Sequence, residues 1–172
     1  MNTRREPLLL TFLLLAFLLA AGHPSQAQLF PDKLIGQWEG MMHISKDGVA
    51  RDSVRIRLTI ANGQSSGTWM WKTEYLSEKL PMVKDYVLRL VDSGKQTYIT
   101  DEGGGIELRD YLFGNKLYCV FETHEVLLTS SYELLGKELI FEVTSGKRLP
   151  PGGEVFNYSV SNLQRAVLKL VR

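Results

Sequence analysis

The chain has 172 residues, of which 20 are basic and 19 acidic, and it carries a single cysteine. Because the charges nearly balance, there is no basic field to attract nucleic acid, and we expect no nucleic-acid partner. One cysteine cannot form an internal disulfide, so an apolar core must hold the fold, and the chain is long enough for one such core.

Residues 1–27 predict a secretory signal peptide. They combine a basic start at Arg4-Arg5, an apolar run over 8–21 and small residues at both ends of Ser25-Gln26-Ala27. The apolar run is shorter than the roughly 20 residues that span a bilayer. We therefore expect cleavage after Ala27 and no stable membrane span in the mature chain. The remaining residues, 28–172, would form one exported domain that is periplasmic or secreted.

From about residue 30 onward the apolar residues alternate with polar ones. Val54, Ile56, Leu58 and Ile60 share one face of a predicted strand, and Asn62-Gly63 after it predicts a type I′ hairpin turn. The same pattern predicts strands near 36–44, 53–61, 67–76, 83–91, 96–101, 106–112, 116–123, 126–134, 138–144, 154–160 and 165–171.

The connections between these strands are short and rich in glycine, asparagine and serine. Such short connections join antiparallel neighbours, because parallel strands need a long crossover. A meander of this kind closes naturally into a barrel, which removes exposed sheet edges. The predicted fold is therefore an all-β, antiparallel up-and-down barrel of about 8–10 strands in a single domain.

The start of the first strand carries the motif Gly36-Gln37-Trp38, preceded by a short irregular lead-in. This arrangement resembles the lipocalin-like (calycin) barrels. The resemblance implies that Trp38 plugs a closed end and that a basic residue of the last strand lies across its ring. Arg165 and Arg172 are the candidates. If the first and last strands pair antiparallel, Arg172 lies nearer Trp38, so we expect Trp38 and Arg172 to form the seal.

The motif also resembles that of a haem-binding barrel family of similar shape. Met42 occupies the position where that family has a further glycine. We therefore predict no haem and no other cofactor.

Aromatic residues on the strands suggest a ligand site. Trp69, Trp71 and Tyr75 would share the inner face of one strand, and small-molecule sites are commonly lined by such rings. We expect them to contact an apolar small molecule, together with Tyr98, Tyr118 and Phe121. The alternative is an interior filled by side chains alone, as occurs in barrels of about eight strands.

The remaining motifs do not indicate an enzyme. Gly63-Gln64-Ser65-Ser66-Gly67 matches a hydrolase nucleophile motif, but it precedes a strand rather than a helix, so we interpret it as a turn. His43 and His124 lie far apart without further ligands, so no metal site is predicted. Cys119 is expected to be a small buried strand residue.

The leading hypothesis is thus an exported carrier that holds an apolar ligand. The alternative is a filled barrel that binds an envelope component or inhibits a protease through its rim loops. Its longest polar loop, 145–153, would then contact a protein partner.

Overall fold

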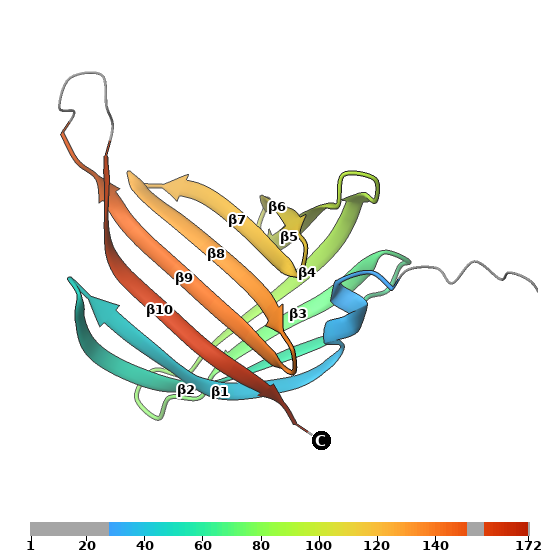
Figure 1. Cartoon of the computed structure of the whole chain (residues 1–172), viewed down its shortest axis with the longest axis horizontal. Helices are drawn as coiled ribbons and strands as arrows, with labels where there is room; N and C mark the ends of the chain where they lie inside the picture. The colour runs from blue at the N-terminus through green and yellow to red at the C-terminus, as the bar shows by residue number, and fades with distance from the viewer. Residues whose placement is uncertain (1–27, 151–156, 172) are drawn as a thin grey trace, which may run out of the picture.

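The computed structural model describes residues 28–150 and 157–171, and these form a closed barrel of ten antiparallel strands. Each strand pairs with its neighbours in sequence, and β1 pairs with β10 to close the cylinder (Figure 1). The strands are β1 (Gly36–Lys46), β2 (Val49–Asn62), β3 (Thr68–Tyr75), β4 (Met82–Asp92), β5 (Thr97–Gly103), β6 (Ile106–Phe113), β7 (Lys116–Thr123), β8 (Val126–Leu135), β9 (Glu138–Arg148) and β10 (Tyr158–Leu170).

The up-and-down barrel predicted from the alternation is confirmed. The closing register is also as expected, since Trp38 of β1 lies opposite Leu170 near the end of β10. The predicted signal peptide and Arg172 lie outside the described residues, so both stay predictions.

Two local predictions were wrong. The stretches 154–160 and 165–171 are not two strands. From Tyr158 onward they form the single strand β10, which stays continuous because a register shift between Val160 and Asn162 absorbs the irregularity. Asn62-Gly63 does not form a two-residue turn either. A five-residue loop, 63–67, follows Asn62, and it is closed by the Gly63 amide donating to the Thr68 carbonyl at 2.8 Å.

A single turn of 3-10 helix, η1 (Pro31–Leu34), closes one end of the barrel. Proline suits the first helical position, where its missing amide hydrogen costs nothing. Pro31 and Leu34 turn into the barrel and are buried together with Phe30. Figure 1 shows this turn at one end, while the β9–β10 hairpin projects from the opposite end.

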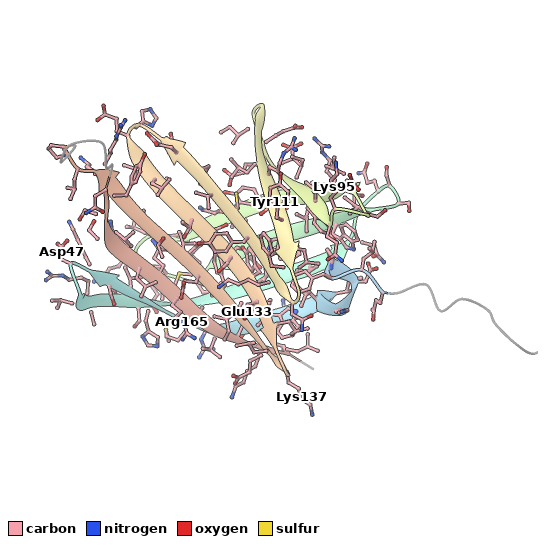
Figure 2. The ribbon with its side chains drawn as sticks, turned by 45° about the horizontal axis from the view of Figure 1, so that its top comes forward. Asp47, Lys95, Tyr111, Glu133, Lys137 and Arg165 are labelled. Carbon is pink, nitrogen blue, oxygen red and sulfur yellow. The ribbon has the colours of Figure 1, made fainter. Side chains whose placement is uncertain are left out.

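The strand turns divide between two rims. The η1 end carries the β4–β5 turn with Lys95, and the other end carries the β1–β2 turn with Asp47; Figure 2 labels these two residues at opposite ends of the molecule. We call the half near η1 the closed end and the other half the open half. Within the part of the chain that the structure describes, no helix is long and apolar enough to cross a membrane.

The motif glycine at the start of β1 is required by its backbone conformation. Gly36 has φ +140°, which L side chains rarely adopt. The close approach of the first and last strands falls at Gly40, where an added Cβ would clash with the backbone carbonyl of Val167.

Candidate functional site

The open half of the barrel contains a partly enclosed cavity of about 90 Å³, lined by residues of β3 to β9. It begins near Trp71 and extends towards the rim, where Tyr75, Lys84 and Phe121 line it. Pockets for drug-sized ligands measure roughly 300–1,000 Å³. The interior is therefore largely filled by side chains, and the remaining space fits a small molecule or the end of a longer one.

Stacked aromatic rings form one wall of the cavity. Tyr132 of β8 lies parallel to Phe141 of β9, with ring centroids 4.4 Å apart. The edge of the next ring, Trp71 of β3, meets Tyr132 at 5.0 Å in a T-shaped contact. These geometries are the ones aromatic pairs prefer, so the wall is well ordered without a ligand.

A carboxyl group also lines the cavity. Asp110 of β6 is 5% exposed, and the hydroxyl of Thr100 on β5 donates to its Oδ2 at 2.8 Å. Burial raises the pKa of Asp110 to about 6, against the smaller opposing effect of the Thr100 hydrogen bonds. Glu102 of β5 also lines the cavity, and its charge adds to the rise in the pKa.

The cavity also contains a buried donor. Trp71 is 3% exposed, and its indole Nε1 makes no hydrogen bond of good geometry to a described residue, although it interacts with the Tyr132 hydroxyl. Burial raises the pKa of the nearby Tyr132 hydroxyl, so this group stays protonated. Cys119 is buried as predicted, and burial followed by the charge of Asp110 raises the pKa of its thiol to about 12. The thiolate that a nucleophile would need is therefore strongly disfavoured.

Of the six residues predicted to contact a ligand, the structure brings three together in the cavity. Trp71, Tyr75 and Phe121 all line it. Trp69 and Tyr98 lie instead at the closed end, with ring centroids 6.1 Å apart. Trp69 Nε1 donates to Asp32 Oδ1 of η1 at 2.7 Å, which fixes the ring beneath the helical turn.

The sixth residue, Tyr118, lies on the outer face of β7. Its neighbours Leu117 and Cys119 are buried, and the Lys116 ammonium lies 5.6 Å from the centre of the Tyr118 ring. Tyr118 is thus separated from the cavity by the sheet itself.

The seal predicted from the family resemblance stays a prediction, because only one of its two residues is described. Trp38 is buried at the closed end, and its indole donates to the Leu34 carbonyl at 2.8 Å. Arg165, the other candidate, lies on β10 and is labelled in Figure 2. It forms an ion pair with Glu142 at 3.5 Å on the outer face of the barrel. Arg172, the favoured partner, lies outside the described residues.

The remaining motifs lie away from the cavity. Ser65 is in the β2–β3 hairpin loop as predicted, with strands on both sides. His43 lies on β1 and His124 in the β7–β8 turn. Of the proposed rim loop, 145–148 belongs to β9, and 151–153 lies outside the described residues.

The sequence reasoning missed the polar residues of the cavity, above all Asp110. The signal was present, because Ile106, Leu108, Asp110 and Leu112 share one alternation phase. A carboxylate in the apolar phase of a strand faces the barrel interior, where an unpaired charge is costly.

Comparisons with known proteins support the fold. No protein-family model matches the sequence, and no curated protein matches it. Among solved structures, the barrel is similar to Rv2717c from M. tuberculosis, with a TM-score of 0.53 and 15% identity over 81% of this chain and 93% of that one. It is also similar to the S-type phycobiliprotein lyase CPES from Guillardia theta, with a TM-score of 0.58 and 7% identity over 83% of this chain and 91% of that one.

Both matches cover more than four fifths of this chain with TM-scores above 0.5, so they share its overall barrel fold. At these identities the likeness concerns the fold alone, because one fold hosts many functions. One of the two is named a lyase, so the expectation that this chain is not an enzyme gains no support from the comparisons.

Proposed function

We propose that this protein binds a small molecule in the open half of its barrel. The observation that carries the proposal is the partly enclosed cavity of about 90 Å³, which has an aromatic wall and a few polar groups. Apolar lining with a small number of oriented polar groups is the usual composition of a ligand site. The ligand enters from the rim opposite η1.

The size of the cavity limits which ligands the expected carrier can hold. A space of about 90 Å³ does not enclose a large ligand such as a haem or a retinoid without rearrangement. The site takes a molecule of a few heavy atoms, or the end of a longer one whose remainder lies at the rim. Trp71, Tyr75 and Phe121 are its apolar contacts. Export, as residues 1–27 predict, is part of the proposal.

Binding of small neutral probes tests this function. Benzene, phenol and 1-butanol are titrated into the protein while tryptophan emission is followed, because Trp71 lines the cavity and reports occupancy. We expect a saturable change for at least one probe. Ser130→Phe, which fills the cavity from β8, should abolish it, whereas Val120→Phe on the exposed outer face of β7 should not.

Two results would contradict the proposal. One is the absence of a saturable response to any probe in the unmodified protein. The other is equal binding by the Ser130→Phe variant, which would place the probes outside the barrel.

A further inference from the structure

The cavity wall carries an excess of negative charge. Asp110 and Glu102 both line it, whereas the only cationic group lining it among the described residues is Lys84, near the start of β4. Ion pairs elsewhere on the barrel hold their partners at 2.7–3.8 Å, but none of those in the described part of the chain includes these three residues. A cation brought by a ligand would therefore meet a net negative wall.

Asp110 is the more deeply placed of the two carboxylates. With a pKa of about 6 it is mostly ionised at neutral pH, although it is only 5% exposed. Thr100 supplies a neutral hydrogen bond, which offsets part of the desolvation of the charge. A buried charge left without a counter-ion is costly, and a cationic ligand would offset that cost.

Aromatic rings strengthen the preference for a cation. Trp71, Tyr132 and Phe141 are in mutual contact at one wall, and Tyr75, Tyr86 and Phe121 line the same cavity. The faces of such rings carry negative potential and attract ammonium groups. An anionic ligand would be opposed by both the rings and the carboxylates.

The indole N–H of Trp71 adds a second requirement. This donor is buried in the cavity wall and makes no hydrogen bond of good geometry to a described residue, its one interaction being with the Tyr132 hydroxyl, whose pKa it lowers against the larger effect of burial. Leaving a buried donor unpaired costs free energy that a hydrogen bond recovers. A ligand that occupies the cavity and carries an acceptor oxygen would supply that hydrogen bond.

We propose that the ligand of this cavity is a small organic cation, an ammonium or quaternary ammonium compound that also bears an acceptor oxygen. The ammonium lies between Asp110 and the aromatic rings, and the oxygen accepts from Trp71 Nε1. This inference rests on the proposed binding function and names the chemical class of its ligand.

The charge of Asp110 makes binding depend on pH. Choline is a suitable probe because its charge is fixed, so any pH dependence between 5 and 8 reports on the protein. Protonation of Asp110 below about pH 6 should weaken choline binding. The titratable groups that surround this carboxyl in the cavity are Glu102 of β5, Cys119 of β7, Tyr132 of β8, Tyr75 of β3, and Lys84 and Tyr86 of β4.

The decisive experiment compares choline with 3,3-dimethylbutan-1-ol, its neutral isostere in which carbon replaces nitrogen. Both are titrated calorimetrically at pH 7.5. We expect choline to bind at least about tenfold more tightly, because only its charge differs. Asp110→Asn should remove that preference, because it should weaken choline binding at least about tenfold more than it weakens binding of the neutral alcohol. Asparagine can still accept the Thr100 hydrogen bond, so the variant should fold.

Asp85→Asn, on the exposed face of β4, is the control for loss of one negative charge and should keep the preference. Equal binding of the two probes, or tighter binding of the anion 4-methylpentanoate than of choline, would overturn the cation assignment. An unchanged preference in Asp110→Asn would overturn the placement of the ammonium beside Asp110. In those cases the neutral alcohol still binds, and the binding function stands. If no probe binds at all, the proposed function fails together with this inference.

Discussion

The tryptophan side chains of the closed end and of the open half differ in their hydrogen bonds. All three tryptophans are buried, at 4%, 2% and 3% exposure for Trp38, Trp69 and Trp71. At the closed end, the Trp38 and Trp69 indoles donate to Leu34 and Asp32 of η1 at 2.8 and 2.7 Å. In the open half, the Trp71 indole makes no hydrogen bond of good geometry within the described residues and interacts only with the Tyr132 hydroxyl.

The difference separates a region built for stability from one that keeps unmet polar groups. η1 completes the hydrogen bonds of the closed end and fills its core with Phe30 and Leu34. No corresponding element covers the cavity in the described part of the open half, where a carboxyl and an indole donor remain beside empty space. A buried carboxyl without a counter-ion and a donor without a hydrogen bond of good geometry both reduce stability, and such departures are expected at binding sites.

The largest expected effect breaks the closed end. Trp38→Ala should lower the free energy of unfolding by about 3–5 kcal/mol, because it leaves a cavity between β1 and η1 and removes the hydrogen bond to Leu34. Urea denaturation followed by circular dichroism measures the change. Val120→Ala, at 52% exposure on the outer face, should shift it by less than about 0.5 kcal/mol. Similar losses for the two variants would show that Trp38 is not a structural plug.

The second prediction concerns the open half, where a substitution at Asp110 should raise the free energy of unfolding at neutral pH. Because the folded-state pKa of Asp110 is raised from 3.8 to about 6, the folded protein binds this proton more tightly than the unfolded chain. Stability should therefore fall as pH rises from about 4 to about 6.5, by up to about 3 kcal/mol for this group. Asp110→Asn should remove that part of the fall and be more stable than the unmodified protein at pH 7.

Denaturant midpoints measured between pH 4 and pH 7.5 provide the test. Asp85→Asn again controls for the loss of one charge. A fall of the same size in Asp110→Asn would assign the pH dependence to other carboxylates.

Alternation in the sequence was sufficient to predict the barrel, because period two determines which face of a strand is buried. It could also have excluded Tyr118, since residues 118 and 121 have opposite phase on one regular strand and cannot both face inward. Asp110 could have been found by the same rule. For both residues, the position in the alternation is enough to predict which face of the strand the side chain occupies.

Depth along the barrel could not be predicted in this way. Trp69 and Trp71 have the same phase on β3, yet one lies beneath η1 and the other lines the cavity. Their separation along the strand is about 6–7 Å, which is enough to move a ring from one environment to the other. Only the position where η1 packs determines that boundary. The turn after Asn62 was missed for a local reason, because Thr68 closes a longer loop there through hydrogen bonds with Gly63 and Ser65.

The smallest expected effect compares the two neighbouring tryptophans directly. Trp69→Phe and Trp71→Phe each shorten a buried ring by a similar area. Only Trp69→Phe breaks a hydrogen bond, and that bond is to a carboxylate. It should therefore cost about 1–2 kcal/mol more than Trp71→Phe. The free energies of unfolding of both variants, measured without ligand at pH 7, give the difference. Equal costs would mean that Trp71 Nε1 is satisfied in solution, by the Tyr132 hydroxyl or by a bound water, and this donor would then no longer distinguish the open half from the closed end.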